Sequence, residues 1–256
     1  MKRAFGSTGI HVSTIGLGSS YGLSGKEVER AYERGVNLLF WGLRRRDDFG
    51  RGIARIAKRD RDGVVIAAQT YSRAAALVEP SVHSVLRERG KIRQIMISCH
   101  HRPSFPTMAK TPGIDSIMVR YNAAHPGAER EVFPHLADAE SGDAPGVLAF
   151  TATRWGTLLD PALTPPGEET PRASDCYRFA ISSPHVHATL AGPKNGAELD
   201  GALDALDRGP LSVEELAWMR RVGANVRDQV KRHGFIHGVD RVRTAIFGAP
   251  HGAAQG

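Results

Sequence analysis

Short apolar runs recur along the chain, and most of them are followed by a stretch in which apolar residues return with helical spacing. Seven of these runs have the length of strands, and one of them, GVVIAAQ, is apolar on both faces, which is typical of parallel strands covered by helices. The seven runs are centred on Ile15, Leu38, Ile66, Ile95, Ile117, Leu148 and Leu190. Regular alternation of such strands with helices predicts an α/β fold of the TIM type, a (β/α) barrel that needs eight strands to close. The pattern therefore predicts an incomplete or distorted barrel with seven recognisable strands.

Turn and capping residues place the first elements of the chain. The segment of residues 1–13 predicts an N-terminal β-hairpin that turns at residues 7–9. A helix is predicted between Ser24, which is a suitable N-cap, and Gly35, which suits the backbone at a helix end. A second helix is predicted over residues 47–58. The hairpin therefore precedes a regular succession of strands and helices.

Length and composition indicate one domain. The chain has 256 residues, of which 41% are hydrophobic, and this is enough for one large core. We interpret residues 1–256 as a single barrel domain. The proline-rich residues 157–171 predict a long loop at the end of the barrel that carries function. Residues 234–256 end in small and polar side chains and predict a flexible tail.

The charge balance narrows the class of partner. The chain carries 34 lysines and arginines against 27 aspartates and glutamates, a net charge of +7. This surplus favours an anionic partner such as a nucleotide cofactor or an acidic metabolite. We expect no nucleic-acid partner, because no zinc-finger spacing, RNA-binding motif or recognition helix accompanies the charge.

Cysteine usage and hydropathy indicate the compartment. The two cysteines, Cys99 and Cys176, are far apart and lack metal-ligand spacing, which suits a reducing environment. No apolar run approaches the ~18 residues that a membrane span requires. We therefore expect a cytoplasmic protein without a membrane partner.

One short segment carries candidate chemistry. Cys99, His100 and His101 are adjacent, and His125 is expected to follow the neighbouring strand. Adjacent residues of a strand point to opposite faces, so at most two of the three could converge on one ion, and no carboxylate lies at ligand spacing. We therefore predict no metal site. One histidine acting as a proton donor is favoured, since an imidazole with an ordinary pKa titrates near neutrality.

Six blocks of sequence, in the right order, resemble aldo-keto reductases over nearly the whole chain. They are "RAFGSTGIHVSTIGLG", the helix leading into "GVNLLF", "RERGKIRQIMIS", "DSIMVRYN", "GVLAFTATRWGTLL" and "SSPHVHATLAGPKNGAELDGALDAL". The resemblance implies a TIM-type barrel that binds NADPH without a Rossmann motif. It also implies reduction of a small carbonyl substrate by hydride transfer. Composition and periodicity alone lead only to the α/β barrel.

The catalytic residues of that family are absent from the positions that the resemblance assigns to them. Where the family carries Asp-Thr-Ala and then Tyr-Gly after the second strand, this chain has Phe40, Trp41 and Gly42. The family's lysine at the end of the third strand matches Gln69, which carries no charge. The family's histidine, at the end of the fourth strand, has no counterpart. We interpret Phe40 and Trp41 as residues that line a pocket.

One βα unit of the family is also missing. Only 90 − 69 = 21 positions separate Gln69 from Gly90, where the family places a helix, the fourth strand and most of another helix. The strands of residues 64–69 and 92–97 would then each keep an unpaired edge, unless something fills the gap. We expect either direct pairing of these two strands in a smaller barrel or a homodimer that covers the gap. Direct pairing is favoured, because 21 positions can hold one crossover helix.

The resemblance assigns cofactor binding to nine residues at the strand ends. Ser98 matches a residue that holds the nicotinamide carboxamide, Phe150 the aromatic ring that stacks on the nicotinamide, and Lys194 a cation that meets the 2'-phosphate of NADPH. The full set is Ser98, Phe150, Thr151, Thr153, Arg154, Gly192, Lys194, Asn195 and Glu198. Judged without the family, Phe150 is equally a core residue and Lys194 a surface cation.

Two classes of function follow. In the first, the protein is an NADPH-dependent oxidoreductase that reduces a carbonyl compound with a substitute proton donor, for which Tyr71, His100 and His125 are the candidates. In the second, it is a barrel without catalytic activity that binds a nucleotide or a protein partner. Fold analogy does not decide between them.

Overall fold

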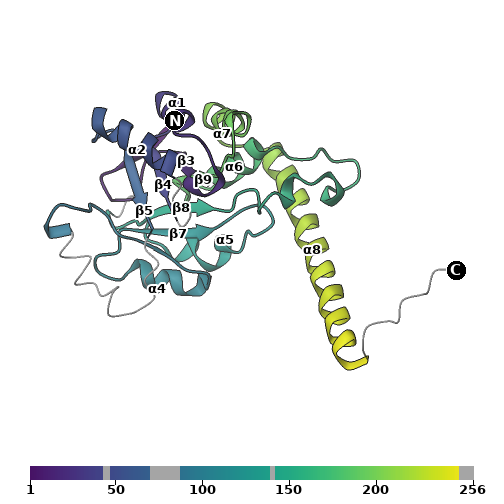
Figure 1. Ribbon diagram of the computed structural model, residues 1–256. Coiled ribbons are helices and arrows are strands. Elements are labelled where there is room, and N and C mark those ends of the chain that lie inside the picture. Colours follow the sequence, from purple (N-terminus) through teal and green to yellow (C-terminus); the bar gives the residue numbers. More distant parts are fainter. Residues whose placement is uncertain (43–46, 70–86, 139–141, 248–256) are drawn as a thin grey trace.

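Seven parallel strands form one curled sheet in the order β5-β4-β3-β9-β8-β7-β6 (Figure 1). The strands are Ile15–Gly18 (β3), Leu38–Trp41 (β4), Val65–Ala68 (β5), Met96–Ser98 (β6), Ser116–Arg120 (β7), Gly146–Phe150 (β8) and Ala188–Ala191 (β9). The structure is a computed structural model that describes residues 1–42, 47–69, 87–138 and 142–247, with side chains as far as residue 231. The predicted incomplete TIM-type barrel is confirmed. Of the seven predicted centres only Ile95 lies outside a strand, one residue before β6.

The predicted N-terminal hairpin is confirmed and covers the amino-terminal end of the sheet. Strands β1 (Lys2–Ala4) and β2 (His11–Ser13) pair antiparallel. The ring of Phe5 then packs against Gly146, where a Cβ atom would lie only 2.5 Å from the ring. Phe5 belongs to one buried cluster with Val12 of the hairpin and with residues on the inner face of the sheet. The hairpin therefore serves as a plug at this end.

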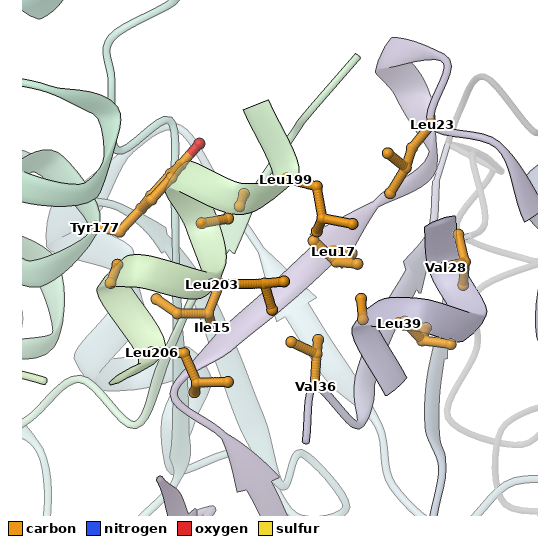
Figure 2. Packing of buried hydrophobic residues seen from close by; sticks show 14 of the residues in the cluster. Ile15, Leu17, Leu23, Val28, Val36, Leu39, Tyr177, Leu199, Leu203 and Leu206 are labelled. Atoms are coloured by element: carbon orange, nitrogen blue, oxygen red, sulfur yellow. The ribbon is translucent and has the colours of Figure 1, made fainter. Parts of the chain in front are cut away.

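Helices cover the outer face of the sheet. The α-helices are Gly25–Glu33 (α1), Asp47–Arg59 (α2), Phe105–Ala109 (α4), Ala128–Glu131 (α5), Ala173–Ile181 (α6), Gly196–Arg208 (α7) and Val213–Phe247 (α8). Short 3-10 helices are Ser19–Tyr21 (η1), Arg102–Ser104 (η3), Phe133–His135 (η4), Thr157–Leu159 (η6) and Pro161–Leu163 (η7). Figure 2 shows how Leu199 and Leu203 of α7 pack over Ile15 and Leu17 of β3, which are fully buried. This apolar layer fixes the strands from outside.

The capping residues act as their types predict. The Ser24 side chain accepts a hydrogen bond from the Glu27 N–H at the start of α1. Gly35 follows the helix with a φ of 96°, a left-handed value that glycine adopts without steric cost. The predicted second helix is confirmed as α2, which is one residue longer than expected.

Helix α8 continues to Phe247, past residue 234 where the predicted flexible tail begins, and projects from the barrel (Figure 1). The flexibility of that segment stays a prediction. Its first turn is anchored by the buried Arg178, which donates to the carbonyl of Gly209 at 2.9 Å and to both carboxylate oxygens of Glu215. This pairing lowers the pKa of Glu215 to about 2. A helix nucleated by such contacts adds further turns at low cost. None of the described helices, α8 included, is apolar enough over a sufficient length to cross a membrane.

Strands β5 and β6 lie at opposite ends of the sheet order. Along the described chain no pairing joins them, so the predicted direct pairing of residues 64–69 with 92–97 is wrong. The seven strands pair in one open order with β5 and β6 at its two edges, and closing the barrel would also require a matching stagger and tilt of the strands. Residues 70–86, which separate the two strands in sequence, lie outside the described residues.

His187 connects β8 and β9 at the amino-terminal end of the sheet. Its ring atom Nδ1 accepts a hydrogen bond from the backbone N–H of Val147 at 3.0 Å. The backbone N–H of His187 donates to the carbonyl of Val147, also at 3.0 Å. Burial, followed by the nearby Arg3, lowers the pKa of His187 from 6.5 to about 4. The ring must therefore be neutral in the folded protein, since a protonated Nδ1 cannot accept.

We predict that this histidine makes folding sensitive to acid. Because its folded-state pKa lies below the unfolded value, its contribution is fully present above pH 6.5 and is lost as pH falls toward 4. His187→Gln keeps an acceptor that does not titrate, so the fall in Tm between pH 7 and pH 5 should be smaller than in the parent. His135→Gln, at an exposed position, is the control. Equal pH dependence in parent and His187→Gln would contradict the assignment.

Candidate functional site

Most of the predicted site residues lie at the carboxyl ends of β7, β8 and β9, at one end of the barrel. The pairing of β7 with β8 ends with Arg120 opposite Phe150. Phe150 is half-buried, and the chain leaves β8 directly after it. In α/β folds of this kind the strand carboxyl ends form the ligand-binding face. We call this carboxyl-terminal end of the barrel the mouth.

The loop after β8 is held in an unusual conformation. Among the described residues, Thr151, Arg154 and Trp155 are the non-glycine residues with left-handed backbone, at φ values of 58°, 52° and 53°. Asn122, just beyond β7, donates from its side chain to the Thr151 carbonyl at 2.8 Å. The cost of such strain is about 1–3 kcal/mol per residue, and it persists mainly at functional sites. The loop therefore presents Thr153 and Arg154 in a fixed geometry.

His125 follows β7 and lies among cationic side chains. Burial is the main cause that lowers its pKa to about 4, and Arg154, Arg120, Arg102 and Arg227 lower it further by repulsion. Its Nδ1 atom is buried without a hydrogen-bond partner in the described structure. At neutral pH the imidazole is therefore uncharged. The expectation of an ordinary pKa for this candidate proton donor is wrong, because neighbouring arginines and desolvation both disfavour the proton.

The residues after β9 form the other part of the mouth. The Asn195 side chain caps α7 by accepting the Glu198 N–H at 3.0 Å, and the Glu198 carboxylate accepts the Lys194 N–H at 2.9 Å. Glu198 thus supplies negative charge at the start of its own helix. The Lys194 side chain is exposed. Of this group, Lys194 is the residue best placed to meet an anion from solution.

Gly192 permits a close contact at the start of the same segment. A Cβ atom at this position would lie 2.2 Å from the ring of Tyr21, which belongs to η1 after β3. The glycine is therefore required by packing against Tyr21. Tyr21 is 47% exposed, and it is a mouth residue that the sequence analysis did not single out.

The histidine segment after β6 is more exposed. Ser98 ends β6 and, like His100, is exposed to solvent. The Cys99 sulfur accepts the His101 N–H, and His101 Nδ1 lies 2.9 Å from the Ser104 hydroxyl. In the described part of the chain no three metal-binding side chains converge. Tyr71, the third candidate donor, lies outside the described residues.

Phe40 and Trp41, at the positions where the resemblance places the Asp-Thr-Ala of aldo-keto reductases, have different surroundings. Trp41 packs against Gly50 of α2, where a Cβ atom would lie 3.3 Å from its ring, and it joins the outer core cluster. We expected Trp41 to line a pocket together with Phe40. Trp41 instead faces the outer core, because neighbouring residues of a strand face opposite sides. The ring of Phe40 instead lies beside Gly42.

Arginines at the mouth were missed by the sequence analysis. Arg120 ends an otherwise apolar strand, Arg102 begins η3, and Arg227 lies on α8. A charged residue at the carboxyl end of a buried strand was the available signal for Arg120. For Arg102 and Arg227 the sequence offers none, because they meet only through the fold.

Solved structures confirm the fold. The aldo-keto reductase AKR11C1 from Bacillus halodurans superposes in its apo form with a TM-score of 0.66 at 18% identity, covering 86% of this chain and 95% of that chain. Its holo form gives 0.68 at 16% identity with the same coverage. A protein described as a 2,5-diketo-D-gluconic acid reductase B gives 0.63 at 19% identity, covering 87% of this chain and 92% of its own. No family model and no curated protein matches the sequence. The chain therefore has the fold of aldo-keto reductases.

We predict that His125 titrates far below neutrality and that Arg154 is partly responsible. Replacing Arg154 by glutamine removes the strongest repulsive charge on the ring, so the pKa of His125 should rise from about 4 toward 6.5. NMR titration of the histidine ring resonances measures this directly. Arg51→Gln, which removes an equal charge from the exposed face of α2, should leave the titration unchanged. A pKa near 6.5 in the parent would contradict the described environment.

Proposed function

We propose that this protein is an NADPH-dependent oxidoreductase that reduces a small carbonyl substrate. The observation that carries the proposal is the aldo-keto reductase fold, together with the placement of the predicted cofactor residues on β8, β9 and their loops at one mouth. A cytoplasmic location follows as part of the same proposal. A homodimer that covers β5 and β6 would account for the edges that have no partner among the described strands.

The residues present fit a nucleotide. The buried Thr151 hydroxyl lacks a hydrogen-bond partner in the described structure, and the Lys194 side chain is free to reach a phosphate. Thr151, Thr153 and Arg154 would hold the pyrophosphate, and Phe150 would support the nicotinamide ring, with Ser98 at its carboxamide. Gly192, Asn195 and Glu198 would form the wall beside the adenosine. When bound, the cofactor supplies the hydride.

The proton for the carbonyl oxygen would come from one of three candidate residues. A neutral His125 can orient a carbonyl oxygen by donating a hydrogen bond, but it is a poor acid at neutral pH. His100 is exposed at the same end of the barrel, and Tyr71 is the third candidate. General acid catalysis adds roughly 10²- to 10⁴-fold. The rate should therefore be low, but hydride transfer does not require the missing tetrad.

A barrel that binds a nucleotide or protein without catalysis is the second candidate function. The observation that favours it is the apolar and uncharged character of the tetrad positions, Phe40 and Gln69. Binding of NADPH without turnover of any aldehyde would favour this candidate over the reductase.

We predict that NADPH binds more tightly than NADH, because Lys194 meets the 2'-phosphate. Since the lysine is exposed and its contact is screened by solvent, the preference should be about tenfold. Lys194→Ala should abolish most of the preference for NADPH. Lys58→Ala, in the last turn of α2, removes an equal charge and should leave the preference unchanged. Fluorescence titration with both cofactors gives the ratio. Equal affinities in the parent would count against this role.

We predict that one of three substitutions removes most of any aldehyde reductase activity. The variants are Tyr71→Phe, His100→Ala and His125→Ala, and the loss of turnover should be about 10²-fold or more at the true donor. Steady-state kcat with saturating NADPH is the measurement. If all three variants keep the parental rate, water is the acid and the substitute-donor hypothesis fails.

A further inference from the structure

The arginines around His125 are not balanced by acidic residues. Arg102 pairs with Glu131 at 2.6 Å, and Arg227 lies 3.5 Å from Asp228. In the described structure Arg120 and Arg154 have no carboxylate partner. The four arginines around His125 therefore face two carboxylates, a surplus of at least two positive charges, since Glu131 is shared with the exposed Arg130 at 2.7 Å.

Partial burial makes this surplus of positive charge unfavourable, since Arg120 and Arg154 are both half-buried. The Arg120 Nε atom is buried without a hydrogen-bond partner in the described chain. Arg154 makes one long side-chain hydrogen bond, from Nη1 to the Val226 carbonyl at 3.5 Å. Burial and the proximity of Arg120 lower the pKa of Arg154, which indicates that the two guanidinium groups repel each other. A partly desolvated cation without a counter-charge is unfavourable, and a bound anion would relieve this cost.

Unused hydrogen-bonding atoms lie at the same place. The Thr151 hydroxyl and His125 Nδ1 are buried and unpartnered in the described residues. They are brought together by Asn122, which binds the Thr151 carbonyl through its side chain and the His125 N–H through its carbonyl at 2.9 Å. Arginine, hydroxyl and imidazole groups are the donors that commonly bind phosphate oxygens.

A more deeply buried arginine, Arg178, shows the contrast. The Arg178 side chain is only 6% exposed, and it is matched by Glu215 at 2.6 Å and by Asp175 at 3.6 Å. The charge of this deeply buried arginine is therefore balanced by carboxylates. No such carboxylate pairs with Arg120 or Arg154 among the described residues.

We propose that Arg120, Arg154 and His125, with Arg102 and Arg227 beside them, form a binding site for the phosphate group of a small molecule. The surplus of two positive charges matches the −1.5 to −2 charge of a phosphate monoester near neutral pH. The phosphate belongs either to the nucleotide or to a separate phosphorylated ligand. The site does not depend on the proposed reductase activity.

The test uses inorganic phosphate and the NMR resonances of the histidine rings. Phosphate, compared with chloride at equal ionic strength, should shift the His125 resonance in a saturable way. The pKa of His125 should rise on binding, since an anion offsets the arginines. Arg120→Gln and Arg154→Gln should each weaken phosphate binding about tenfold or more. Arg51→Gln, which removes an equal charge from an exposed ion pair on α2, should bind like the parent.

Two results would overturn the site. The first is the absence of a saturable His125 response in the parent, a measurement that needs no variant and does not depend on variant folding. The second is an unchanged affinity in the folded Arg120→Gln/Arg154→Gln protein.

Titration with NADPH in the presence of phosphate shows whether the site binds a phosphate group of the nucleotide or that of a separate ligand. Competitive loss of the phosphate signal assigns the group to the nucleotide, whereas simultaneous binding assigns it to a separate ligand, and both agree with the site. Failure of NADPH to bind would overturn the proposed reductase but leave the phosphate result standing.

Discussion

The parallel pairing of β7 with β8 is the interaction on which the mouth depends. These strands pair over their whole length, from Ser116 opposite Gly146 to Arg120 opposite Phe150. Because both strands end at the same level, Asn122 reaches the Thr151 carbonyl and holds the strained loop that carries Arg154. A shift of one residue in this register would send each side chain to the opposite face. The cationic cluster would then no longer form.

Two histidines at opposite ends of the sheet, His187 and His125, both have a lowered pKa but differ in their hydrogen bonds. His187 uses its unprotonated nitrogen to accept a backbone N–H, so its low pKa accompanies a satisfied structural bond. His125 has a similarly low pKa, but the corresponding nitrogen has no partner in the described structure. Among the described residues nothing offsets the desolvation of this nitrogen, and perturbed groups of this kind are common at functional sites.

The charged groups at the carboxyl ends of the strands are concentrated on one side of the sheet. The ends of β4 and β5 carry Phe40 and Gln69, whereas charge is concentrated after β6, β7 and β8. A ligand bound at this mouth would therefore be recognised chiefly by arginines. Any reduction would take place in a strongly positive field, which favours anionic substrates and stabilises negative charge that develops on a carbonyl oxygen.

Local signals in the sequence determined the secondary structure and the count of seven strands. The hairpin, the Ser24 cap and the Gly35 stop depend on residues that are neighbours in the chain, so periodicity and turn chemistry are sufficient to predict them. The pairing of strand edges is non-local, and for this reason the expected contact between residues 64–69 and 92–97 was wrong. The cluster of Arg102, Arg120, Arg154 and Arg227 is equally invisible in the sequence. Only the order of strands and the course of α8 bring these four residues to His125, and the pKa of its ring is set by their distance and burial, not by its own sequence context.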